Sequence, residues 1–76
     1  MKSMQISLEK ASQVKDFVQI VQKYPYDIEL KSERYIVDAK SILGIFSLDL
    51  ARPLTIEIHS DDCDEFVKQL ERFIVE

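Results

Sequence analysis

Four short stretches of this chain alternate apolar and polar residues, the pattern of β-strands with one buried face. They cover residues 4–8, 27–30, 35–39 and 54–58. Polar residues 31–34 separate the second stretch from the third and predict a hairpin turn between them. Because each strand has a single apolar face, helices can cover only one side of the sheet that the strands form.

Two other stretches space their apolar residues three and four positions apart, as amphipathic helices do. The first should end at Tyr24, since the residue before a proline is pushed out of helical conformation. Ser7 or Ser12 could cap its start, and Ser60, Asp61 and Asp62 could cap the second. The two apolar stripes consist of Val14, Phe17, Val18 and Val21, and of Phe66, Val67, Leu70, Phe73 and Ile74.

A third, shorter helix is predicted after Ser41, whose hydroxyl is a preferred N-cap. A helix of about nine residues is unstable alone, so packing must hold it. A domain this small cannot bury every apolar side chain of the helix, and we expect Ile42, Leu43 and Phe46 to reach the surface in part.

The predicted order is β-α-β-β-α-β-α, which gives an α+β protein with all helices on one face of the sheet. With 76 residues, the chain is expected to form a single domain over residues 1–76. One core should lie between sheet and helices, built from Ile6, Val18, Val21, Ile28, Val37, Ile56, Ile58, Phe66, Leu70 and Phe73.

The charge and the cysteine count restrict the partners and the compartment. A net charge of −4 argues against nucleic acid and anionic membranes, which both select basic surfaces. One cysteine cannot form an internal disulfide, and neither a signal peptide nor an apolar run of membrane length is present. We therefore expect a cytoplasmic protein whose partners are other proteins; its oligomeric state stays open.

The only histidine, His59, lies close to Asp61, Asp62 and Cys63. Such a cluster can suggest a metal site, but zinc needs three or four ligands and no second group of ligands accompanies it. A polar strand end followed by a helix start explains the residues better, with Cys63 as a structural thiol. We predict no metal site and no cofactor.

Residues 40–48 read Lys-Ser-Ile-Leu-Gly-Ile-Phe-Ser-Leu. This stretch resembles the Lys-Ser-Ile-Met-Gly-Val-Met-Ser-Leu segment of HPr, the phosphocarrier protein of the bacterial sugar phosphotransferase system. The similarity covers roughly residues 17–76. It implies an open-faced β-sandwich of HPr type, with a four-stranded antiparallel sheet and three helices on one face.

The resemblance fails where HPr keeps its phosphorylated histidine, in a His-Ala-Arg-Pro motif before the first helix. Lys10 falls near the histidine position here, although the register of residues 1–13 is open. A protonated lysine is no nucleophile at neutral pH, so this chain is expected to lack histidine phosphotransfer. We do not expect it to be an enzyme.

Ser41 has two candidate roles, and only one of them is implied by the resemblance; both stay open. In many HPr proteins the serine at this place is phosphorylated by a dedicated kinase; it can equally be an N-cap alone. Lys40, Ile42, Leu43 and Phe46 correspond to the surface by which HPr meets enzymes and regulators. The implied partners are a serine kinase, phosphotransferase components or a transcription regulator. The alternatives are a divergent phosphocarrier and a purely structural interaction domain.

Overall fold

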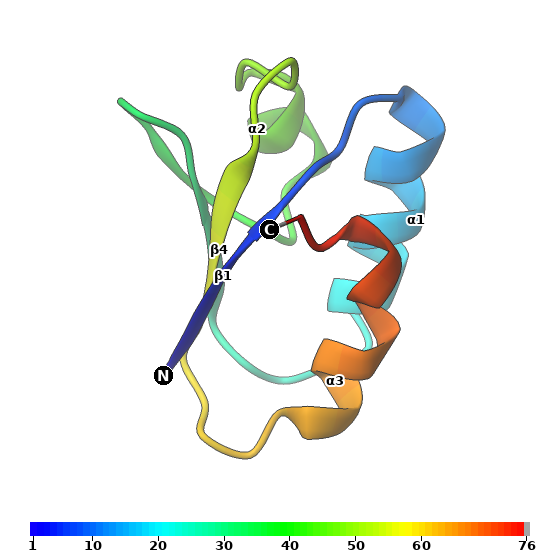
Figure 1. The fold of residues 1–76 in the computed structure, drawn as a ribbon, viewed down its shortest axis with the longest axis vertical. Coiled ribbons are helices and arrows are strands. Elements are labelled where there is room, and N and C mark those ends of the chain that lie inside the picture. Colours follow the sequence, from blue (N-terminus) through cyan, green and yellow to red (C-terminus); the bar gives the residue numbers. More distant parts are fainter. Residues whose placement is uncertain (76) are drawn as a thin grey trace.

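The computed structural model describes residues 1–75 and has one antiparallel sheet with helices packed on one face (Figure 1). The strands are β1 (Lys2–Ile6), β2 (Ile28–Lys31), β3 (Ile36–Asp38) and β4 (Leu54–Ile58). The helices are α1 (Ala11–Val21), α2 (Ile42–Phe46), α3 (Asp64–Gln69) and the 3₁₀ helix η1 (Glu71–Phe73). The predicted α+β class and the order of elements are confirmed.

The strand order in the sheet is β1-β4-β2-β3, so β4 lies between two strands from distant parts of the chain. Met4 and Leu30 both lie opposite Ile56, and all strand pairs are antiparallel. The inward residues of β4 are buried while Thr55 and Glu57 are only partly so. This contrast shows that one face of the sheet carries the helices and the other is open.

The core fills the space between the sheet and the helices, as predicted, with one exception. Val37 is only partly buried and packs against the core from its edge, because β3 is a short strand at the side of the sheet. The buried set also includes Leu8, Ala39 and Ile45, which link the loops and α2 to the core. Cys63 is buried, in agreement with a structural thiol.

The boundaries of two strands differ from the predicted ones. The first strand ends at Ile6 and not at Leu8, although Leu8 is fully buried in the loop that follows. The strand predicted over residues 35–39 is only Ile36–Asp38. Tyr35 lies in the preceding turn and is exposed.

The predicted caps of two helices are wrong. Neither Ser7 nor Ser12 caps α1: its N-cap is Lys10, and Ser12 lies inside the helix. The N-cap of α3 is Cys63; Ser60 instead accepts a hydrogen bond from the Asp62 amide in the preceding turn. In both cases serines near the helix start satisfy the sequence pattern, but the chain enters the helix at another residue.

The last helix is also shorter than its apolar stripe predicted. The α-helix ends at Gln69, and after η1 the backbone becomes extended at Ile74. Ile74 forms a bridge with Ile6, and the Val75 amide donates to the Gln5 carbonyl over 3.0 Å. Residues 73–75 therefore run beside the outer edge of β1 (Figure 1).

Within residues 1–75, no helix has the length and apolar character needed to cross a membrane.

Candidate functional site

Ser41 stands at the start of α2, as predicted, and acts as its N-cap. Its backbone is extended (φ −97°, ψ 104°), and its Oγ accepts a hydrogen bond from the Gly44 amide over 3.1 Å. The turn that leads into the helix is held by Asp38, whose carboxylate accepts from the Lys40 amide over 2.9 Å. Ser41 is exposed, so a second molecule can reach its hydroxyl.

Gly44 explains why a glycine stands in the middle of so short a helix. A Cβ at this position would lie 3.1 Å from the Ser41 Oγ and 3.3 Å from the Val37 Cβ. These separations are tighter than ordinary van der Waals contact. The glycine thus lets α2 pack closely on β3 while the cap remains in place.

The rest of α2 divides its apolar residues between the core and the solvent. Ile45 is fully buried and Ile42 is half-buried, whereas Leu43 and Phe46 have exposed fractions of 81% and 43%. We call Lys40, Ser41, Ile42, Leu43 and Phe46 the α2 surface. The structure brings all five predicted residues to this one short segment, which presents a hydroxyl, a cation and apolar side chains to solvent.

The start of α1 is built differently. The Gln13 side chain folds back and its Oε1 accepts from the amides of Glu9 and Lys10, over 2.8 and 3.0 Å. Lys10 has an extended backbone (φ −120°, ψ 151°) and an exposed side chain. A glutamine therefore satisfies two amides at the position where the resemblance implied a phosphorylated side chain.

Comparison with known proteins finds a family that includes the starts of both α1 and α2. A family model described as "PTS HPr component phosphorylation site" matches residues 9–76. The chain belongs to the HPr family.

Solved structures of HPr proteins support this membership. HPr from Thermoanaerobacter tengcongensis is similar at 30% identity and a TM-score of 0.80, with 97% of this chain and 91% of that chain covered. HPr from Bacillus anthracis is similar at 31% identity and a TM-score of 0.67, covering 97% and 94%. Bacillus subtilis Crh, at 24% identity, a TM-score of 0.66 and coverage of 96% and 90%, supports the fold alone. No curated protein sequence matches the chain significantly.

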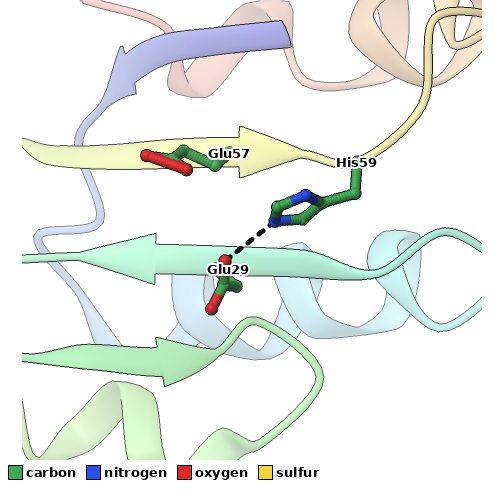
Figure 2. A group of neighbouring side chains, drawn as sticks. All are labelled: Glu29, Glu57 and His59. Atoms are coloured by element: carbon green, nitrogen blue, oxygen red, sulfur yellow. Dashed lines mark hydrogen bonds and ion pairs between the residues drawn. The ribbon is translucent and has the colours of Figure 1, made fainter. Parts of the chain in front are cut away.

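Within the HPr fold, the sole histidine lies far along the chain from the start of α1. His59 follows β4, and its Nε2 lies 2.8 Å from Glu29 Oε1 on the neighbouring strand β2 (Figure 2). Glu57 comes from β4, and one ligand atom from each of the three side chains lies within 4.8 Å of the others. We call Glu29, Glu57 and His59 the open-face triad.

The open-face triad is the part of the molecule that sequence reasoning missed. His59 does not gather Asp61, Asp62 and Cys63 around it; the Cys63 thiol is buried and donates towards the Ser60 carbonyl over 3.6 Å. Glu29 and Glu57 are 28 residues apart in the sequence and meet only because β2 pairs with β4 in one register. The alternating pattern of the two strands predicts that Glu29 and Glu57 lie on the open face. It does not predict that they lie opposite each other.

Lys31 is the positive side chain that pairs with a carboxylate of this face. Lys31 Nζ lies 2.5 Å from Glu57 Oε1. This hydrogen bond, with the nearby charge of Glu29, raises the pKa of Lys31 above its ordinary value, against a smaller opposing effect of burial. The carboxylates of β2 and β4 therefore create a negative potential that draws cations to the open face.

Proposed function

We propose that this HPr-family domain is a regulatory protein-interaction module that does not relay phosphate through a histidine. The α2 surface is its contact region, and phosphorylation of Ser41 is its switch. One observation carries the proposal: the start of α1 has Lys10 and Gln13 where phosphotransfer needs an imidazole, while the start of α2 keeps an exposed serine beside exposed apolar side chains.

The chemistry at α1 supports the first half. The ammonium group of a protonated lysine offers no lone pair to phosphorus. The Gln13 side chain occupies the Glu9 and Lys10 amides, which could otherwise hold a phosphoryl group. His59 follows β4 and is paired with Glu29 on the open face.

The geometry of Ser41 supports the second half. A phosphoserine carries a charge of about −1.5 to −2 at neutral pH. Next to the first amides of a helix, such a charge gains about 0.3–1 kcal/mol at an exposed site, while the neighbouring Asp38 opposes it. Because these effects nearly cancel, the modification should change the charge of the α2 surface and leave the fold intact.

The absence of histidine chemistry is tested with phosphoenolpyruvate and the general phosphotransferase enzyme, with B. anthracis HPr as positive control. We expect acid-labile phosphate on the control and none on this protein. Phosphohistidine at His59 would contradict the proposal and favour a divergent phosphocarrier.

Serine phosphorylation is tested with an HPr serine kinase and ATP, followed by mass spectrometry. Ser41→Ala should abolish labelling, whereas Ser47→Ala, the matched control at the other end of α2, should not. Leu43→Glu should slow labelling by removing an exposed apolar contact without altering the hydroxyl. If Ser41 stays unmodified while the HPr control is labelled, the serine is a cap only and the structural alternative stands.

A further inference from the structure

Three carboxylates form a row across the open face of the sheet. Asp38 lies directly opposite Glu29, and Glu29 lies directly opposite Glu57, on the adjacent strands β3, β2 and β4. Residues directly opposite in a sheet place their side chains on the same face, and like charges in such pairs destabilise it. The row therefore needs positive charge for compensation.

The charged residues around the row supply only part of that compensation. Lys31 pairs with Glu57, and His59 contacts Glu29. Beside the triad lies a hollow of about 480 Å³, whose titratable lining residues are Tyr26, Asp27, Glu29, Asp38, Lys40 and His59. Three carboxylates face one lysine in this hollow, so a small cation would be attracted into it.

The open-face triad has the donor atoms for such a cation. His59 offers Nε2, and each glutamate offers a carboxylate oxygen; the three atoms lie within 4.8 Å of one another. Figure 2 shows His59 and Glu29 in contact, whereas the Glu57 carboxylate extends along β4 away from the imidazole. A tetrahedral ion with bonds of about 2.0–2.1 Å places its ligand atoms about 3.3 Å apart. His59 Nε2 and Glu29 Oε1 are already 2.8 Å apart, so these two ligands need to separate only slightly; Glu57 must turn its carboxylate from Lys31 towards them.

We propose that Glu29, Glu57 and His59 form a binding site for one divalent transition-metal ion, with Zn²⁺ as the best match. An imidazole nitrogen with two carboxylates selects zinc and its neighbours over calcium or magnesium, which prefer oxygen ligands alone. The metal takes the Nε2 lone pair of the neutral imidazole, whose single ring proton is then carried by Nδ1. The hollow beside the triad gives water access to the fourth position.

Glu57 is the least exposed member of the triad. Its side chain is 17% exposed, whereas those of Glu29 and His59 are 39% and 40% exposed. Lys31 holds Glu57 Oε1 and competes with the metal for this carboxylate. The site thus predicts an unusual result: removal of a positive side chain should strengthen metal binding.

The test uses the full chain without an affinity tag, freed of metal by a chelator, and titrates it with Zn²⁺ by calorimetry. We expect one site per chain. His59→Asn and Glu29→Gln should each weaken binding by about tenfold or more, since even changes around metal ligands cost 10–100-fold. Lys31→Gln should tighten it. Glu33→Gln, the same chemical change at an exposed carboxylate paired with Arg52, is the matched control and should leave binding unchanged.

Two further readouts keep the result independent of variant folding. In the wild-type protein, Zn²⁺ should shift the NMR signals of His59 and of neighbouring β2 and β4 residues. With Co²⁺ the absorption spectrum should have no thiolate-to-metal band. The proposal is overturned if the wild type binds no zinc, if Glu33→Gln weakens binding as much as Glu29→Gln, if Lys31→Gln does not tighten it, or if a thiolate band places the ion on Cys63.

Discussion

Helices α1 and α2 are stabilised in different ways: α1 by its buried face and α2 by its N-cap. Helix α1 has eleven residues and buries four side chains, whereas α2 has five residues and buries only Ile45. The long helix begins at an exposed lysine, and the short one begins at a serine whose hydroxyl accepts from Gly44. A helix with a large buried face tolerates many residues at its start; a helix without one depends on its cap.

This difference bears on the function of an HPr-family chain. Packing of α1 does not require any particular residue at Lys10, so a catalytic side chain could be lost there without loss of the fold. At α2 the cap, the glycine and the close approach to Val37 depend on one another. Ser41 therefore has a structural role at the start of α2, whether or not a kinase modifies it.

The largest effect is expected from a change in the buried face of α1. Phe17 is fully buried and meets Phe73 edge to face at 5.8 Å. Phe17→Ala should lower the free energy of unfolding by about 3–5 kcal/mol, from lost burial and the cavity that remains. Chemical denaturation measures this loss. A loss below about 1 kcal/mol would mean that α1 is not held by packing.

A second substitution tests whether α2 is stabilised by packing of Ile45 in the core. Ile45→Ala should cost about 2–5 kcal/mol, because the side chain is fully buried. Leu43→Ala, two positions away and 81% exposed, is the control and should cost less than about 0.5 kcal/mol. Equal losses in the two variants, measured by the same denaturation, would contradict the division of α2 into a core side and a solvent side.

The two caps are compared by matched substitutions. Ser41→Ala should destabilise the protein by about 1 kcal/mol, since the Gly44 amide loses its acceptor. Lys10→Ala should change stability by less than about 0.5 kcal/mol, because Gln13 satisfies the amides there. If Lys10→Ala destabilised the protein more than Ser41→Ala, the claim that α2 depends more on its cap than α1 does would be wrong.

The smallest effect is expected when Ser41 is replaced by another good cap. Ser41→Asp should leave the free energy of unfolding within about 0.5 kcal/mol of the wild type, because aspartate and serine are similar N-caps. The same variant should weaken binding to a partner that needs a neutral α2 surface. A marked fall in thermal stability would show that negative charge at this position disturbs the fold.

Local patterns in the sequence predicted most of the fold. The alternating strands, the stripe of α1 and the cap of α2 each depend on neighbours within a few residues, and periodicity reports such neighbours. The end of α3 was missed because apolar spacing continues through Phe73 and Ile74, although the backbone changes from α to 3₁₀ and then to extended. The apolar spacing of residues 66–74 predicted which side chains face the core, but it overestimated the length of the helix.

The open-face triad could not be predicted in the same way. Its residues come from two strands, and their meeting depends on the register in which Glu29 pairs with Glu57. A shift of the register by one residue would move one glutamate to the helix-covered face. The α2 surface, in contrast, is contiguous in sequence, so all of its residues could be named beforehand; its role in binding remains a prediction.

The pairing of β1 has a consequence for the order in which the protein can be assembled. One edge of β1 pairs with β4, and on the other edge residues 5–7 contact residues 73–75, so all of these partners lie far from β1 in the sequence. Contacts of such long sequence separation slow folding, because a large loop must close before they form. A nascent chain that ends before β4 leaves both edges of β1 open. A circular permutant that joins residue 75 to residue 2 by a short linker would make the contact between Ile6 and Ile74 local, and it should fold faster than the natural chain.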